Sequence, residues 1–132
     1  MTSASPLAFA APGLGQQLDA ASEAQLDQLD FGVIAFDADT VVCRYNATES
    51  QAAGLSPQRV LGQPLFTNVA PCMNNFMVAQ RFEDALDTGI DLDATIDYVL
   101  TLRMRPVKVK LRLLAHPASS TRYVLVARRA AQ

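Results

Sequence analysis

The sequence predicts an α+β fold, in which one five-stranded antiparallel sheet carries helices on one face and a helical N-terminal cap on the other. Two apolar, β-prone runs come first, a helical middle follows, and three further runs end the chain. The run 107–114 alternates apolar and basic residues, as a strand with one buried face does. Because 132 residues suffice for one core only, we expect one compact domain with a cap, residues 1–29, and a core, residues 30–132.

The N-terminal third predicts two short helices followed by a strand hairpin. After a loose lead-in, apolar residues recur through 16–29 with a break at Ser22, which forms a capping-box pattern with Gln25. The β-prone runs 31–36 and 41–45 flank an Asp-rich turn. The Asp-x-Asp pattern of this turn lacks the glycine and the closing glutamate of a calcium loop, so turn chemistry explains it better.

The rest of the chain predicts helices and then three strands. Helices are expected over 46–54 and 57–61, then a connecting segment over 62–71, and a longer helix over 76–87 that Asn74 or Asn75 caps and Gly89 ends. The last helix has an apolar face typical of core packing, made of Val78, Phe82, Ala85 and Leu86. Strands are expected over 94–102, 107–114 and 122–128. In the middle one, Val107, Val109, Leu111 and Leu113 should point inward, and Lys108, Lys110 and Arg112 outward.

Charge is distributed unevenly along a chain of net charge −2. No Lys or Arg precedes Arg44, and no acid follows Asp97 although most of the basic residues do. A nucleic-acid surface would explain the basic end, but we favour an acidic N-terminal segment that packs over a basic sheet face. The apolar runs are too short to cross a bilayer, no basic leader begins the chain, and two cysteines make no disulfide or zinc pattern. We therefore expect a cytoplasmic protein that binds neither nucleic acid nor membrane nor metal.

Cys72 is the candidate reactive group. A lone cysteine in such a domain is more often a small buried hydrophobe, but Cys72 directly precedes a predicted helix, whose N-terminus favours a thiolate. Pro71 restricts Ala70 to an extended conformation, which orients the loop. The only histidine, His116, lies in a late loop, so the thiol has no neighbouring base and a cysteine hydrolase is disfavoured.

Tyr45 and Glu49 are the candidate polar pair. Their i, i+4 spacing would place both side chains on one face of a helical turn. An arbitrary pair of this kind is more often a surface glutamate beside a half-buried tyrosine. Here the helix that follows has few large residues, which would leave room for a bulky group.

From about Leu29 to Arg128, the chain resembles the photoactive yellow protein family, whose fold is a PAS domain. The resemblance rests on ordered motifs: Leu29-Asp30-Phe31-Gly32, Tyr45-Asn46-Ala47-x-Glu49, Val60-Leu61-Gly62, Asn68-Val69-Ala70-Pro71-Cys72 and Pro106-Val107-Lys108-Val109-Lys110. It implies a blue-light photoreceptor that is not an enzyme and carries p-coumaric acid (4-hydroxycinnamic acid) as a thioester on Cys72. Its phenolate would be hydrogen-bonded by Tyr45 and Glu49, and its carbonyl by the N–H of Cys72. The implied pocket is lined by Ile34, Ala53, Leu55, Val69, Ala70, Pro71 and Met104.

The chain departs from the family pattern at the pocket. Ala53 and Leu55 stand where a threonine supporting the tyrosine and a shielding arginine are usual, and Leu102 stands where an aromatic residue is common. Cys43 has no counterpart at the site and is expected in the core. These departures support an alternative, a PAS-type ligand-binding or protein-interaction module without this chromophore.

The resemblance also implies how a signal would arise. Light isomerises the chromophore from trans to cis, and Glu49, neutral in the dark, gives up its proton. We expect this carboxylate to have no cationic partner, so that the buried charge drives partial unfolding, with the cap leaving the sheet. The partner would be a downstream signalling protein of unknown identity, and the chain a monomer or weak dimer.

Overall fold

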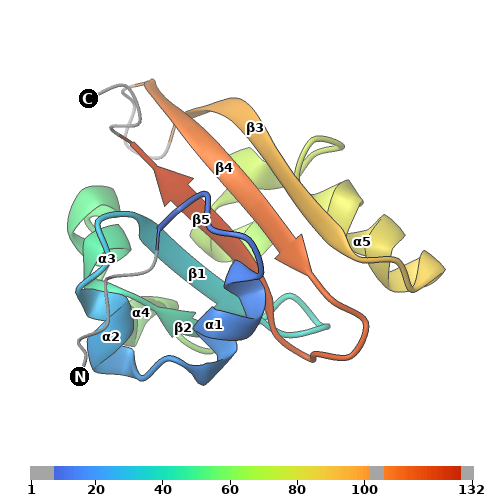
Figure 1. The fold of residues 1–132 in the computed structure, drawn as a ribbon. Helices are drawn as coiled ribbons and strands as arrows, with labels where there is room; N and C mark the ends of the chain where they lie inside the picture. The colour runs from blue at the N-terminus through green and yellow to red at the C-terminus, as the bar shows by residue number, and fades with distance from the viewer. Residues whose placement is uncertain (1–7, 102–105, 129–132) are drawn as a thin grey trace, which may run out of the picture.

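The computed structural model describes residues 8–101 and 106–128, and these form one sheet with helices on both faces (Figure 1). The helices are α1 (Leu14–Ala20), α2 (Glu23–Asp27), α3 (Ala47–Ala53), α4 (Pro57–Val60), the π-helix η1 (Leu65–Val69), the 3-10 helix η2 (Pro71–Met73) and α5 (Ala79–Thr88). The strands are β1 (Gly32–Phe36), β2 (Val42–Tyr45), β3 (Leu92–Leu100), β4 (Val107–Ala115) and β5 (Arg122–Ala127).

The sheet is antiparallel throughout, with the strand order β2-β1-β5-β4-β3. The first strand of the chain, β1, and the last, β5, are therefore paired neighbours inside the sheet. In Figure 1 the blue helices α1 and α2 lie over one face of this sheet, and α5 lies on the other side. The predicted α+β class, strand number and N-terminal cap are confirmed.

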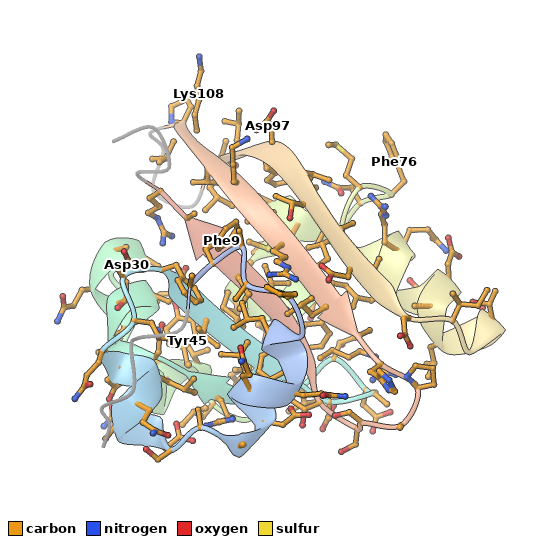
Figure 2. The ribbon with its side chains drawn as sticks, in the orientation of Figure 1. Phe9, Asp30, Tyr45, Phe76, Asp97 and Lys108 are labelled. Atoms are coloured by element: carbon orange, nitrogen blue, oxygen red, sulfur yellow. The ribbon has the colours of Figure 1, made fainter. Side chains whose placement is uncertain are left out.

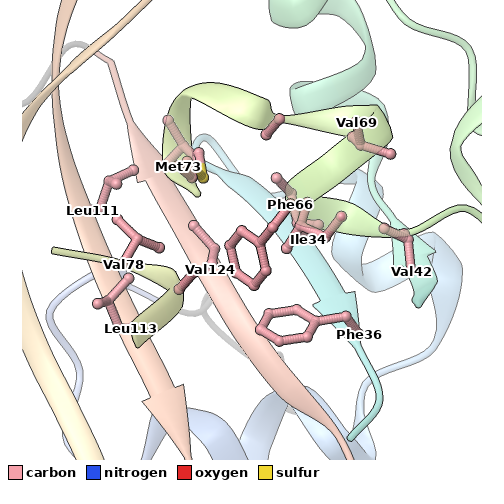
Figure 3. Packing of buried hydrophobic residues seen from close by; sticks show 14 of the residues in the cluster. Ile34, Phe36, Val42, Phe66, Val69, Met73, Val78, Leu111, Leu113 and Val124 are labelled. Carbon is pink, nitrogen blue, oxygen red and sulfur yellow. The ribbon is translucent and has the colours of Figure 1, made fainter. Parts of the chain in front are cut away.

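Each face of the sheet has its own apolar core. The main core, on the face of η1, η2 and α5, is shown in Figure 3 and includes Ile34, Phe36, Val42, Tyr45, Phe66, Val69, Met73, Val78, Phe82, Leu111, Leu113 and Val124. The cap core holds the N-terminal helices against the opposite face and consists of Leu14, Leu18, Leu26, Leu29, Phe31, Val33, Ala35, Leu114, Tyr123 and Leu125. The alternation of inward and outward residues along β1 and β5 thus serves two cores at once.

Basic side chains of the sheet hold the cap, as the charge pattern indicated, although mostly through backbone carbonyls. Arg44 donates to the carbonyls of Leu18 and Ala21 and pairs with Glu23 at 2.8 Å. Arg112 donates to cap carbonyls and makes a two-pronged pair with Asp93 of β3. Arg112 was expected at an outward position, and it is outward from the main core, yet the cap buries it.

Several local predictions are confirmed in detail. Ser22 and Gln25 make the reciprocal capping box at the start of α2. The Asp37 carboxylate accepts from the N–H groups of Asp39 and Val41, so the Asp-rich turn is held by its own side chain. The helix expected over 46–54 is α3, with Asn46 as its N-cap and Gly54, in the left-handed conformation, as its C-cap.

Other local predictions are wrong. The last helix begins at Ala79, not at residue 76, because the Asn75 side chain accepts from the N–H groups of Met77 and Val78 and holds a separate turn. Leu86 was expected on the apolar face of its helix and Val107 at an inward position, but both are exposed, Val107 as the first residue of β4. The connecting segment contains the π-helix η1, which no sequence signal indicated.

Candidate functional site

Tyr45 and Glu49 are both buried, but they do not share a helical turn. Tyr45, labelled in Figure 2, is the last residue of β2 and is 5% exposed, whereas Glu49 lies in the first turn of α3 and is 1% exposed. The predicted helical spacing is wrong because Asn46 between them is the helix cap, with extended backbone angles. The strand end and the helix start nevertheless bring both polar groups into the interior.

Asn46 fixes the position of this strand–helix junction. Its Oδ1 accepts from the N–H groups of Val33 and Glu49, at 2.9 and 3.0 Å. Its Nδ2 donates to the carbonyls of Leu26 and Phe31, at 2.8 and 3.1 Å. One buried amide therefore uses its full hydrogen-bonding capacity to join the cap, β1 and α3.

The hydroxyl of Tyr45 is a buried donor without a hydrogen-bond partner among the residues that the structure describes. Its Oη makes no hydrogen bond to any residue within 8–101 and 106–128. Burial raises the pKa of Tyr45, the Glu49 carboxylate raises it further, and Arg128 opposes part of the shift. The phenol is thus neutral and able to donate at physiological pH. Buried donors are normally paired, so this one suggests a missing acceptor.

Glu49 has a cationic partner, which contradicts the sequence-based expectation. Arg128, just beyond β5, donates from Nη1 to Oε1 at 2.6 Å and from Nη2 to Oε2 at 3.0 Å. Burial lowers the pKa of Arg128, but the hydrogen bonds and charge of Glu49 outweigh it and raise that pKa overall. The two residues are 79 positions apart, so only the tertiary fold brings them together.

Gly32 leaves the space that the Glu49 carboxylate occupies. A Cβ at position 32 would overlap Oε1 of Glu49 and lie 3.0 Å from its Cδ. Any side chain at this position would therefore displace the carboxylate. The glycine was noted in the sequence as part of a motif, but its steric role follows only from the structure.

Cys72 lies in η2, directly after the π-helix η1, and is partly buried against the main core. Its carbonyl accepts from the Tyr98 hydroxyl at 2.5 Å and from the Asn75 amide at 3.2 Å. Asn75 also donates to the Tyr98 oxygen at 2.6 Å. Sequence reasoning missed Tyr98, whose strand β3 ties the cysteine loop to the sheet.

The other predicted pocket residues differ in how deeply they are buried. Ile34, Val69 and Ala70 are buried in the main core with Tyr45, and Leu55 and Cys72 pack against that core. Ala53 is buried on α3, whereas Pro71 is exposed. Met104 lies outside the described residues, and so does Leu102. Most of the predicted lining therefore converges on one side of the sheet, as Figure 3 shows for Ile34 and Val69.

Cys43 is exposed, so its expected place in the core is wrong. In the pairing of β1 with β2, Ala35 faces Arg44 and Phe36 faces Val42, which leaves Cys43 as the extra residue of a β-bulge. At a bulge, side chains need not alternate strictly between the two faces of the sheet. The thiol available inside the fold is that of Cys72.

Two cavities lie away from the candidate site residues Tyr45, Glu49 and Cys72. One, of about 420 Å³, lies between α1 and the β4–β5 loop, and the other, of about 220 Å³, lies beside Phe36, Phe66 and Arg122. Tyr45, Glu49 and Cys72 line neither of them. Within the part of the chain that the structure describes, there is no acid, histidine and cysteine cluster fit for a metal, and no helix able to span a membrane.

Comparison with known proteins identifies the family. Residues 26–129 match a family model described as PAS fold. The chain is 38% identical over 91 residues to photoactive yellow protein of Rhodothalassium salexigens, covering 69% of this chain and 72% of the relative. It is 34% identical over 105 residues to photoactive yellow protein of Halochromatium salexigens, covering 80% and 83%. The chain belongs to the photoactive yellow protein family.

Solved structures agree with this assignment. The photoactive yellow protein domain of the sensor histidine kinase Ppr from Rhodospirillum centenum is 37% identical and superposes with a TM-score of 0.77, covering 84% of this chain and 96% of that domain. A quorum-sensing receptor PAS domain from Cronobacter turicensis has a TM-score of 0.60 at 14% identity. That second likeness shows the fold alone. The chain is accordingly a sensory PAS domain of the photoreceptor type.

Proposed function

We propose that this protein is a blue-light photoreceptor that carries p-coumaric acid as a thioester on Cys72. The observation that supports this best is the buried Tyr45 hydroxyl, a neutral donor that lacks an acceptor among the described residues. A phenolate oxygen would supply that acceptor. Cys72 packs against the same apolar core, in a chain that belongs to the photoactive yellow protein family.

Attachment would be an acyl transfer to the thiol. The Sγ of Cys72 forms a new bond to the acyl carbon of an activated p-coumaroyl donor, while the bond to the activating group breaks. The thiol proton leaves with that group, so no oxidant or reductant is required. Because Cys72 and Leu55 pack against the main core that includes Tyr45, we expect side chains around Tyr45 and Leu55 to move when the group enters.

The chain's own residues would hold the group and move one proton. The chromophore would supply absorption of blue light and trans–cis isomerisation. Tyr45 donates a hydrogen bond from Oη, and Glu49 holds a proton on its carboxyl in the dark and gives it up after illumination. Tyr98 and Asn75 fix the carbonyl of Cys72, which keeps the attachment loop in place.

The decisive test is a visible absorption spectrum after the chain is mixed with an activated p-coumaric acid derivative, before and after a blue flash. We expect a visible band that bleaches and recovers, that is lost in Cys72→Ala, and that is kept in the matched control Cys43→Ala. If the folded protein gains no band, or keeps the band in Cys72→Ala, the proposal fails. The alternative, a PAS ligand-binding or interaction module without this chromophore, would then be preferred.

The signal would be released by the N-terminal cap. We propose that residues 1–29 leave the core, residues 30–132, after illumination and expose the sheet face that Arg112 and Tyr123 now share with the cap. Hydrogen exchange should then rise over 8–29 in the light and stay unchanged over β4. Equal protection of the cap in dark and light would contradict this. We further propose a cytoplasmic monomer or weak dimer that acts on a downstream signalling protein.

The proton of Glu49 can be tested separately. Glu49→Gln keeps a hydrogen-bond donor but removes the proton source, so we expect a coloured dark state and loss of the long-lived bleached state. Glu83→Gln, an exposed acid on α5, is the matched control. A normal bleached state in Glu49→Gln would refute the transfer.

A further inference from the structure

Glu49 and Arg128 form a two-pronged ion pair in the interior of the protein. Both hydrogen bonds are short, at 2.6 and 3.0 Å, and the carboxylate side chain is 1% exposed while that of Arg128 is 18% exposed. A two-pronged arginine–carboxylate pair is charge-assisted and geometrically specific. The absence of a side chain at Gly32 allows the carboxylate to lie where it does.

This pair compensates a buried charge. A carboxylate alone in an apolar interior is costly, because its charge has no partner. Here the guanidinium of Arg128 donates two hydrogen bonds to the carboxylate of Glu49. Three titratable or charged groups face one another here, Tyr45 from β2, Glu49 from α3 and Arg128 from the end of β5. Tyr45 stays neutral because burial raises the pKa of its hydroxyl.

We infer that Arg128 is the resident counter-cation of the chromophore site, and that it pairs with the carboxylate of Glu49 whenever this residue carries no proton. This inference rests on the proposed function. The site then contains one negative charge beside Arg128 in every state. Glu49 carries that charge in the chromophore-free protein and again after illumination, and it is neutral only while a bound anion carries the charge instead.

Arg128 should change the response of this chain to illumination. The carboxylate formed by light meets an arginine within hydrogen-bonding reach, so it does not have to be exposed to water to be stabilised. The pair described here is the arrangement expected after proton release. Arg128 should therefore lengthen the life of the bleached state and reduce the unfolding that an unpaired carboxylate would cause.

The first experiment uses the purified chain without chromophore. Infrared spectra at pH 7 report the C=O stretch of protonated buried acids, and comparison with Glu49→Gln assigns it. We expect no acid band from Glu49 in the natural chain, a clear band in Arg128→Gln, and none in Arg128→Lys, which keeps the charge. A Glu49 acid band in the natural chain, or its absence in a folded Arg128→Gln, would overturn the inference.

Arg122 provides the matched control. It is the first residue of β5, the strand that ends just before Arg128, and it is buried. It makes no hydrogen bond to Glu49, whose carboxylate accepts from Arg128. Arg122→Gln should leave the infrared spectrum unchanged. A Glu49 acid band in Arg122→Gln would mean that general loss of charge, not loss of the specific pair, protonates the acid, and would count against the inference.

The second experiment uses the chromophore-loaded protein and a blue flash. Since charge-assisted hydrogen bonds contribute about 1.5–3 kcal/mol, we expect recovery in Arg128→Gln to be at least about tenfold faster than in the natural chain. A band with unchanged recovery would refute the role of Arg128 and leave the proposed photoreceptor intact. Absence of a band in every variant would instead refute the photoreceptor, and the infrared result would still decide whether Arg128 holds Glu49 ionised.

Discussion

Replacing Asn46 with alanine should be among the most damaging single changes in this protein. The substitution removes four hydrogen bonds of 2.8–3.1 Å. The N–H groups of Val33 and Glu49 lose their side-chain acceptor, whereas the carbonyl of Leu26 keeps the N–H of Leu29. At about 1 kcal/mol for each hydrogen bond, with partial compensation by water, the free energy of unfolding should fall by about 3 kcal/mol. That is a large fraction of the ~5–15 kcal/mol typical of a domain.

Urea unfolding followed by circular dichroism measures this loss. With a denaturant dependence of about 2 kcal/mol per molar for a domain of this size, the midpoint should fall by about 1.5 M at an unchanged slope. Asn46→Ser keeps an N-cap side chain for α3 but loses the hydrogen bonds to the carbonyls of Leu26 and Phe31. It should recover about 1 kcal/mol of the stability lost in Asn46→Ala.

The control is Asn68→Ala. Asn68 is exposed and its side chain donates to Gln63 alone, so its loss should change stability by less than about 0.5 kcal/mol. A loss below about 1 kcal/mol for Asn46→Ala would refute the reasoning, since it would mean that the junction does not depend on the amide.

Three further predictions concern other contacts. Gly32→Ala should cost about 1–3 kcal/mol, because its Cβ would overlap Glu49, and most of that cost should disappear in a double variant with Glu49→Ala. Tyr98→Phe should raise hydrogen exchange over residues 71–75 and lower stability by about 1 kcal/mol. Arg112 holds the pKa of Asp93 below its ordinary 3.8, so this pair stabilises the fold above that pH and is lost as the pH falls through the lowered value. Acid titration should show the natural chain to be more stable than Asp93→Asn above about pH 3.8, with an advantage that shrinks as the pH falls through that window. The advantage should be less than about 1 kcal/mol because the carboxylate is half exposed.

Local chemistry made much of the fold predictable. The capping box at Ser22 and Gln25 marks a helix start because both partners lie within one turn. Asn46 and Gly54 bound α3 for similarly local reasons. The alternation along residues 107–114 placed Val109, Leu111 and Leu113 correctly in the main core. In these cases the decisive interaction lies within a few residues of the pattern.

The parts that could not be predicted depend on distant segments. Arg128 contacts Glu49 across 79 positions, and nothing near either residue signals the pair. Cys43 is turned outward by a bulge that exists only in the pairing with β1. The late start of α5 follows from an Asn75 side chain that caps a turn in place of the helix. The assignment of Cys72 as the attachment residue stays a prediction.

The contact between Gly32 and Glu49 should also leave a trace in the history of this family. Because a side chain at position 32 and an acid at position 49 cannot occupy the same space, a lineage cannot replace the glycine first without loss of fitness. The acid must be lost before the glycine is free to vary. Among homologues, sequences with neither residue and sequences with the glycine alone should both occur, while those that keep the acid without the glycine should be rare.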